Sequence, residues 1–314
     1  MRTKVFIDGE HGTTGLQIRK RLASRNDLEI LSISADDRHN ETARLERLNA
    51  ADIAILCLPD DAAIETVKSI ANNKKLRIID SSTAHRISPQ WIYGFAELTK
   101  GQSERIEAAQ FVANPGCYPT GALSIIRPLR EAGIMAEDFP VSINAVSGYT
   151  GGGKKMIGQM EDQSREDRIT ANYFIYGLNL RHKHVPEIRV HGKLAQSPIF
   201  MPSVGRFPQG MIVNIPLHNT LLTKTVSLAD LRSIFNAHYH ESKFVKVASE
   251  EENSRLARLD AELLANTDEL KIFVFGDEKN GIFNISAVLD NLGKGASGAA
   301  VQNLDLMIGD HRKD

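Results

Sequence analysis

The chain has 314 residues, of which 42% are hydrophobic and 25% are charged; this composition is typical of a soluble globular protein and excludes a disordered or fibrous one. Its length exceeds one ordinary domain and predicts two. Because 38 basic residues nearly balance 39 acidic ones, the net charge of −1 argues against nucleic acid or an anionic membrane as a partner. No apolar run is long enough to span a membrane, and the first nine residues lack a signal-peptide core, so we expect a cytoplasmic protein.

The first third of the chain alternates short apolar runs with segments of helical spacing. The runs are residues 4–7, 28–33, 52–58 and 77–79. We interpret each run as a strand, and the spacing of residues 16–23 predicts a helix after the first. This alternation is typical of βαβ units in a parallel sheet with helices on both faces. We therefore expect an α/β fold whose residues 1–115 form a doubly wound Rossmann domain.

After residue 115 the pattern changes to longer alternating runs with few helical segments between them. The clearest runs are residues 141–146, 211–217 and 271–275. They predict a mixed or antiparallel sheet in a second, α+β domain over residues 116–295. Residues 296–309 return to helical spacing, so the tail 296–314 is expected to hold a helix that packs back on the first domain.

A glycine-rich turn lies between the first predicted strand and its helix. Its members are Gly9, Gly12, Thr13, Thr14 and Gly15. Glycine lets a pyrophosphate approach the backbone N–H groups at a helix N-terminus, so the turn predicts a dinucleotide site; a plain structural turn is the alternative. Leu58 and Pro59 close the third strand, where the adenosine would lie.

The end of the second predicted strand carries both residue types that distinguish NAD from NADP. Carboxylates such as Asp36 and Asp37 usually mark NAD, whereas an arginine such as Arg38 marks NADP. The residue types leave the choice open. Our hypothesis is that Arg38, with Ser34 nearby, contacts the 2′-phosphate of NADP.

Cys117 has the position expected of a nucleophile. It follows Asn114-Pro115-Gly116 and precedes the helical run 122–129, so its thiol would lie near a helix N-terminus, where the dipole favours the thiolate. A buried structural cysteine is the alternative, and it is our interpretation of Cys57, which lies in an apolar run. Two cysteines make neither a disulfide framework nor a zinc cluster, so no metal is expected.

Two histidines, His182 and His184, precede Pro186, a residue well suited to the first position of a helix. Either imidazole could serve a thiol as acid and base, because its unperturbed pKa lies near neutrality; a basic surface segment is the alternative. Position alone does not decide between them. We favour His184, which lies closer to the helix start, with Glu187 as the next candidate.

Two other segments could hold an anion. The segment from Ser147 to Lys155, which includes Gly148, combines exposed N–H groups with two lysines, Lys154 and Lys155; a flexible turn is the alternative. The segment from Asp80 to Arg86, which includes Ser81, lies at the end of a predicted parallel strand, and its arginine could bind a carboxylate or a phosphate.

Together these segments resemble the N-acetyl-gamma-glutamyl-phosphate reductase family of the aspartate-semialdehyde dehydrogenase superfamily. The resemblance covers most of the chain and is most specific at Asn-Pro-Gly-Cys-Tyr-Pro-Thr (114–120) and His-x-His-x-Pro-Glu-Ile (182–188). Ala96 stands where the family usually has proline, and residues 201–207 lack its usual Pro-His pair. These departures and the short chain suggest the compact branch of the family.

The resemblance implies NADPH-dependent reductive dephosphorylation of N-acetyl-gamma-glutamyl phosphate to N-acetylglutamate 5-semialdehyde, a step of arginine biosynthesis. It implies a thioester on Cys117, acid and base chemistry from His182 and His184, and Asn291 beside the nicotinamide. We expect Ser81 and Gly148 to contribute to the cofactor site. Expected substrate contacts are Arg86, Asn114, Lys154 and Glu187. A homodimer or homotetramer would cover an exposed face of the second domain's sheet.

Two other functions share parts of this pattern. An aspartyl-phosphate reductase of the same superfamily would have the same frame but a different pocket from residues 182–188. A non-enzymatic NADP-binding redox sensor would keep the glycine turn and the reactive thiol and would need no histidine pair.

Overall fold

The computed structural model describes residues 2–34, 36–37 and 40–309, which form two compact units. The first unit contains the described residues up to Ala96, Gly101–Gly116 and the segment from Ala296 onward. The second contains Glu97–Lys100 and Cys117–Gly295. Over the residues described, no helix has both the length and the apolar character that crossing a membrane requires.

The first unit is built on a six-stranded sheet with the order β2-β1-β3-β4-β6-β5. The strands are β1 (Thr3–Asp8), β2 (Leu28–Leu31), β3 (Ile53–Leu56), β4 (Arg77–Asp80), β5 (Ile92–Tyr93) and β6 (Phe111–Ala113). The neighbouring strands pair in parallel. The four apolar runs of the sequence correspond to β1 to β4, and the expected parallel sheet is confirmed.

Side chains alternate along β1 between two separate cores. Val5 and Ile7 pack in one cluster and Phe6 packs in the other. The first cluster includes side chains of α1 (Thr13–Leu22) and α4 (Gln102–Ala108), and the second includes side chains of α2 (Glu41–Ala50) and α3 (Asp60–Ser69). Because successive strand residues point to opposite faces, helices on both sides are needed to bury them, as in a doubly wound fold.

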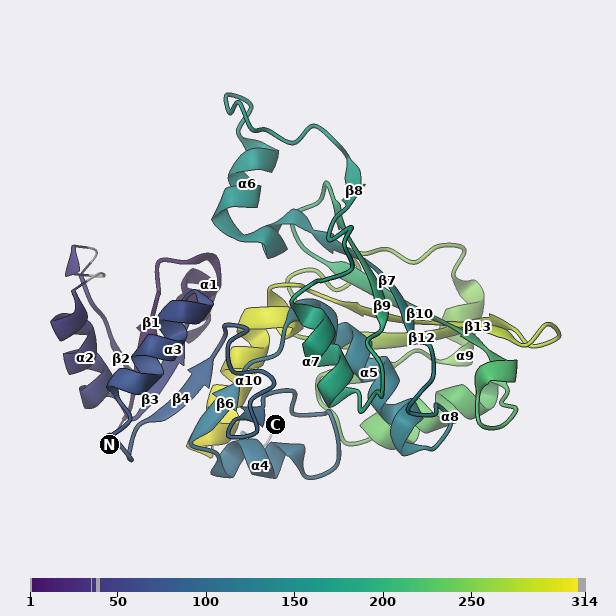
Figure 1. The fold of residues 1–314 in the computed structure, drawn as a ribbon, viewed down its shortest axis with the longest axis horizontal. Coiled ribbons are helices and arrows are strands. Elements are labelled where there is room, and N and C mark those ends of the chain that lie inside the picture. Colours follow the sequence, from purple (N-terminus) through teal and green to yellow (C-terminus); the bar gives the residue numbers. More distant parts are fainter. Residues whose placement is uncertain (1, 35, 38–39, 310–314) are drawn as a thin grey trace. The chain divides into compact units, whose positions relative to one another are not determined.

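The C-terminal helix α10 (Gly298–Ile308) completes the first of these cores. Ala300, Leu304 and Met307 form the apolar stripe expected from the sequence, and all three are buried in the cluster that contains Ile18 and Ile106. Figure 1 shows α10 in yellow beside α4. The expected closing helix is therefore confirmed.

The second unit contains a seven-stranded mixed sheet with the order β11-β12-β13-β10-β7-β9-β8. Its strands are β7 (Ser142–Gly148), β8 (Tyr173–Ile175), β9 (Ile199–Gly205), β10 (Met211–His218), β11 (Val245–Val247), β12 (Leu270–Asp277) and β13 (Ile282–Leu289). β7 pairs with β9 and β11 with β12 in parallel, and the other pairs are antiparallel. The mixed sheet expected from the sequence is confirmed.

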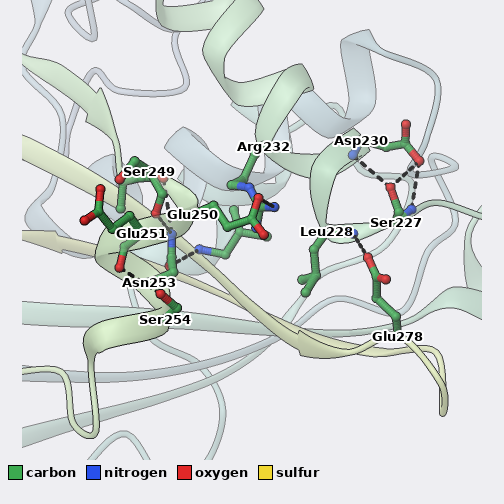
Figure 2. Close-up of polar contacts among 12 residues, drawn as sticks. Ser227, Leu228, Asp230, Arg232, Ser249, Glu250, Glu251, Asn253, Ser254 and Glu278 are labelled. Carbon is green, nitrogen blue, oxygen red and sulfur yellow. Dashed lines mark hydrogen bonds and ion pairs between the residues drawn. The ribbon is translucent and has the colours of Figure 1, made fainter.

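The expected helical run 122–129 lies in the first helix of the second unit and is confirmed, but the expectation of few helical segments between the strands of this unit is wrong. Its helices are α5 (Cys117–Glu131), α6 (Gly153–Glu161), α7 (His184–His191), α8 (Leu228–Tyr239) and α9 (Glu250–Arg255). Two of them begin with capping boxes, in which Ser227 pairs with Asp230 and Ser249 pairs with Glu252. Figure 2 shows these two helix starts, together with Glu278, which accepts the N–H of Leu228. The Ser-x-x-acid pattern is the sequence signal that would have predicted both helices.

Candidate active site

Cys117 is the first residue of α5, and its side chain is partly exposed. The twelve residues that follow it, 118–129, are all buried, and α5 packs against β10 and β13. The sheet therefore fixes the helix, and the helix presents the thiol at its N-terminus. The helix dipole favours an anion at that end, which suits a thiolate nucleophile.

Tyr118 connects the nucleophile to the two histidines. Its ring centroid lies 6.3 Å from that of His182 and 6.0 Å from that of His184. Its hydroxyl donates to the carbonyl oxygen of Ser203 on β9, 2.7 Å away. The structure thus places Cys117 and both imidazoles around one anchored tyrosine, although the histidines lie more than sixty positions after Cys117 in the sequence.

The two imidazole rings lie against each other with their centroids 4.6 Å apart. His184 is buried and is the first residue of α7, so the prediction that Pro186 opens this helix is wrong. The helix starts earlier because Nδ1 of His182 accepts the N–H of His184 at 3.1 Å, satisfying one of the unpaired N–H groups at the helix start. Burial lowers the pKa of His182 to about 4, and the charge of Lys183 contributes in the same direction.

Tyr176 is a site residue that the sequence analysis missed. Its ring lies 5.5 Å from that of His182. Burial raises the pKa of Tyr176 to about 12, and the nearby Cys117 contributes to the shift. The pKa of Tyr118 is also well above its usual value, mainly because of burial. Both phenols therefore stay protonated near neutral pH and can donate hydrogen bonds. Tyr176 follows the short strand β8, where no periodicity or motif marked it.

Asn291 is buried and holds two loops of the second unit. Its Oδ1 accepts the N–H of Gly210 at 2.9 Å, and its Nδ2 donates to Oγ1 of Thr150 at 2.9 Å. The N–H of Gly148 donates to the carbonyl of Gly210 at 2.9 Å, so the same loops form one hydrogen-bonded assembly. The role of Asn291 and Gly148 beside a nicotinamide stays a prediction.

The two substrate contacts expected in this unit have different surroundings. Glu187 is buried on α7, three residues after His184. Lys154 is exposed in the first turn of α6. Both assignments stay predictions.

In the first unit, the glycine turn joins β1 to α1 next to the end of β3. Gly9 has a φ of +87°, and a β-carbon there would lie 2.5 Å from the carbonyl oxygen of Cys57. The N–H of Gly12 donates to the carbonyl of Gly9 at 2.9 Å, and α1 begins at Thr13. In the sheet, β2 lies on one side of β1, and β3 and then β4 lie on the other side. The turn after β1 is therefore at the point where the strand order reverses. Dinucleotides bind at this point in doubly wound sheets.

The other expected cofactor contacts of the first unit lie around this turn. Thr14 and Gly15 are in the first turn of α1, and Leu58 and Pro59 connect β3 to α3. Oγ of Ser34 donates to the carboxylate of Asp37 at 2.7 Å. Arg38, on which the NADP hypothesis depends, lies outside the described residues.

Asn114 directly follows β6, and Arg86 lies in the loop after the neighbouring strand β4. Arg86 is buried, and its guanidinium donates to the carbonyls of Asn114 at 2.9 Å and Ser81 at 3.1 Å. The amide of Asn114 donates to the carbonyl of Ala296 and accepts from Asn303, each at 3.0 Å. These side chains hold the loops after the two strands together. Their contact with substrate or cofactor stays a prediction.

Two family models match the chain. The model described as semialdehyde dehydrogenase, NAD binding domain, matches residues 4–108, and the one described as semialdehyde dehydrogenase, dimerisation domain, matches residues 117–291. Among solved structures, aspartate semialdehyde dehydrogenase II from Vibrio cholerae superposes with a TM-score of 0.73 over 99% of this chain and all of that one, at 15% identity. That likeness shows the shared fold and confirms the two-domain α/β class.

Curated relatives are much closer in sequence. N-acetyl-gamma-glutamyl-phosphate reductase from Brucella anthropi is 62% identical over 98% of this chain and 99% of its own length. The protein of the same name from Brucella suis is 60% identical over 98% of this chain and 100% of its own length. The chain belongs to the N-acetyl-gamma-glutamyl-phosphate reductase family, whose two domains are those of the semialdehyde dehydrogenases.

Proposed function

We propose that the protein reduces N-acetyl-gamma-glutamyl phosphate to N-acetylglutamate 5-semialdehyde with NADPH, in arginine biosynthesis, through a thioester on Cys117. The observation that carries the proposal is Cys117 at the N-terminus of α5, with both imidazoles next to the adjacent Tyr118. The names of relatives at 60–62% identity support the substrate.

The chemistry begins with attack of the Cys117 thiolate on the γ-carbonyl carbon. The carbon–sulfur bond forms, the carbon–oxygen bond to phosphate breaks, and phosphate leaves with the electron pair of that bond. A thioester accepts hydride where a carboxylate does not, which is why a covalent intermediate makes the reduction accessible. A bound nicotinamide supplies that hydride. The resulting thiohemiacetal then expels the thiolate and releases the aldehyde.

The residues around the thiol suit the proton transfers in this sequence. The tetrahedral stages carry negative charge on the former carbonyl oxygen, and the protonated phenol of Tyr176 is a donor close to Cys117. We assign acid and base chemistry to His184. His182 stays neutral near pH 7, because burial lowers its pKa to about 4.

The glycine turn of the first unit fits a dinucleotide. A side chain at Gly9 would collide with the backbone of Cys57, so the turn keeps its N–H groups open at the start of α1. Thr13 and Thr14 would add hydroxyl groups near the phosphates, and Arg38 would select NADP. Asn291, whose amide is held by Gly210 and Thr150, would lie beside the nicotinamide.

We propose that the protein assembles as a homo-oligomer through the second unit, in the cytoplasm. On β7, Ile143 and Ala145 are buried while Asn144 between them is exposed. Ile199, Pro216 and Ile282 are also exposed, and the strand register places them on the same face as Asn144. A second copy that covers this face would bury its apolar side chains. The match to a family model named for dimerisation supports this assembly.

The reaction is tested in the reverse direction. Purified protein should reduce NADP when N-acetylglutamate 5-semialdehyde and inorganic phosphate are both present, and omission of phosphate should stop the turnover. Aspartate semialdehyde is the comparison substrate, because the solved structures with this fold carry that name. Equal turnover of both aldehydes would contradict the proposed specificity. Tight NADP binding without any turnover would favour the redox sensor.

A further inference from the structure

We propose that Lys294 and Glu97 are positioning residues for the nucleophile, because their buried ion pair anchors the turn of residues 290–295, which lies against Cys117. The inference rests on the proposed function only in assigning Cys117 as the nucleophile. Neither residue belongs to the contacts with substrate or cofactor described above.

The ion pair is buried inside the second unit. Nζ of Lys294 lies 2.7 Å from Oε2 of Glu97, and the two side chains are 2% and 11% exposed. The same ammonium lies 5.3 Å from the centre of the Phe244 ring, within the range of a cation–π interaction. The carbonyl of Glu97 lies 3.2 Å from Nε2 of His238 on α8, so the acid is itself held in place.

The turn that carries Lys294 contacts the nucleophile through the next residue. A β-carbon on Gly295 would lie 2.8 Å from Cβ of Cys117, which means that the glycine backbone already packs against the cysteine. The N–H of Gly295 donates to the carbonyl of Asp290 at 2.9 Å, and the Asp290 carboxylate accepts the N–H groups of Leu292 and Gly293. One end of the turn is thus fixed by Asp290 and the other by Lys294.

The ion pair is a costly way to hold a turn if stability were its sole purpose. Two buried charges lose their hydration, and uncharged residues of similar size often give a fold that is no less stable. What the pair adds is a defined position for the turn, since a buried ammonium has few places where its charge is balanced. A small displacement of a reacting group lowers the rate of a reaction steeply, so a fixed position here affects catalysis.

The test compares Glu97→Gln, Lys294→Met and the double variant Glu97→Gln/Lys294→Met. Lys294→Met alone removes the ammonium that balances a buried carboxylate and can fail to fold, whereas the double variant contains neither charge. We expect the double variant to keep a melting temperature near that of the wild type. Its kcat should fall at least about tenfold, with KM for the cofactor within about threefold. Glu97→Gln should lose as much as the double variant, because the pair acts as a unit.

The second readout needs no substrate. The rate at which iodoacetamide alkylates Cys117 at pH 7 should change at least about threefold in both variants, after subtraction of the rate in Cys117→Ser, which reports Cys57 alone. Folded variants with wild-type kcat and wild-type alkylation would overturn the proposal. If the protein shows no reductase activity, the alkylation rate still decides whether the pair positions the thiol.

A matched control removes an ion pair that belongs to the first unit and is far from Cys117 in the sequence. Arg25 binds Asp305 through Nη1 at 2.6 Å, and its side chain is 9% exposed. Arg25→Met should lower the melting temperature and leave both kcat and the alkylation rate of Cys117 unchanged. A loss of kcat in this control as large as in the double variant would show that reduced stability alone explains the effect, and would overturn the proposal.

Discussion

The backbone N–H of His184 donates to Nδ1 of His182, 3.1 Å away. A nitrogen that accepts this bond carries no proton, so the neutral ring of His182 holds its hydrogen on Nε2. Burial lowers the pKa of His182 to about 4, which agrees with a ring that stays neutral through the pH range of most enzymes. The two histidines are therefore unequal, and His184 is the better candidate for a residue that gains and loses a proton during catalysis.

We predict that His184→Asn lowers kcat by about 10²–10⁴, the range typical of general acid and base groups, and removes a limb near neutral pH from the pH–rate profile. His182→Asn should have a milder effect, because the asparagine carbonyl can still accept the N–H of His184. Steady-state kinetics between pH 5 and pH 9 separates the two variants. If His182→Asn is the one that loses the limb, the roles are exchanged. If neither loses it, Glu187 becomes the candidate.

The lowered pKa of His182 also predicts a pH dependence of stability. Between the folded-state pKa of about 4 and the unfolded value near 6.5, the unfolded chain binds more protons at this residue than the folded one. The free energy of unfolding should therefore rise with pH across this window and decline as the pH falls through it. The contribution should be about 1–2 kcal/mol, since the ring is partly exposed and solvent reduces the effect.

Denaturant unfolding at pH 4.5 and pH 7 measures this contribution. His182→Asn should show a smaller difference in unfolding free energy between the two pH values than the wild type. His238→Asn is a useful comparison, because burial lowers the pKa of His238 as well, in another part of the second unit. If His182→Asn shows the same pH dependence of the unfolding free energy as the wild type, then burial does not keep the ring of His182 neutral in the folded protein.

For the nucleophile, we predict that Cys117→Ser abolishes turnover and leaves NADP affinity near the wild-type value, because a hydroxyl is a far poorer nucleophile at neutral pH. Cys57→Ser is the matched control. Burial raises the pKa of Cys57 to about 12, so this thiol stays protonated, and its loss should mainly affect stability. Activity in Cys117→Ser above about a tenth of the wild-type value, or roughly 1.4 kcal/mol of barrier, would contradict covalent catalysis.

The sequence predicted the first unit better than the second, for a physical reason. Strands β1, β3 and β4 are largely buried on both faces, so each contains a continuous apolar run such as Ile53–Leu56. The edge strand β2 is less buried and has the exposed Glu29 between its apolar residues. In the second unit, residues 118–129 of α5 are buried on all sides and α9 has only six residues, so neither shows a clear helical stripe. α7 begins at His184, where Nδ1 of His182 accepts the N–H, and not at Pro186. The spacing of hydrophobic residues carries no information about such local hydrogen bonds.

The candidate site shows the same division. Cys117, His182 and His184 were found from short motifs, because a turn before a helix and a histidine pair are local features. Tyr176 and the Lys294–Glu97 pair were not found, because their roles depend on contacts between distant segments. From the sequence alone a lysine is expected at the surface, whereas the side chain of Lys294 is only 2% exposed in the structure.

The cofactor preference gives a further prediction. Arg38→Ala should weaken NADP binding by about 1.5–3 kcal/mol, the usual size of a hydrogen bond to a charged group, and should barely change NAD binding. Titration of both cofactors by intrinsic fluorescence or calorimetry measures the difference. Ser34→Ala should have a smaller effect, since the Ser34 hydroxyl already donates to Asp37. Equal weakening of NAD and NADP would count against Arg38 as the selecting residue.

The contact between Gly295 and Cys117 predicts the outcome of a single added methyl group. In Gly295→Ala the new Cβ would lie 2.8 Å from Cβ of Cys117 and 2.9 Å from the carbonyl oxygen of Asp290, both closer than real β-carbons approach other atoms. Either the cysteine or the turn must move, and a shift of about 1 Å at a reacting group can cost about 10²-fold in rate. We expect kcat to fall by at least about tenfold while the protein stays folded. Gly158→Ala on α6 is the control, because its new Cβ would meet Arg165 at an ordinary 3.4 Å and alanine favours a helix. Full activity in Gly295→Ala would mean that the turn adjusts freely, and that its contact does not set the position of the thiol.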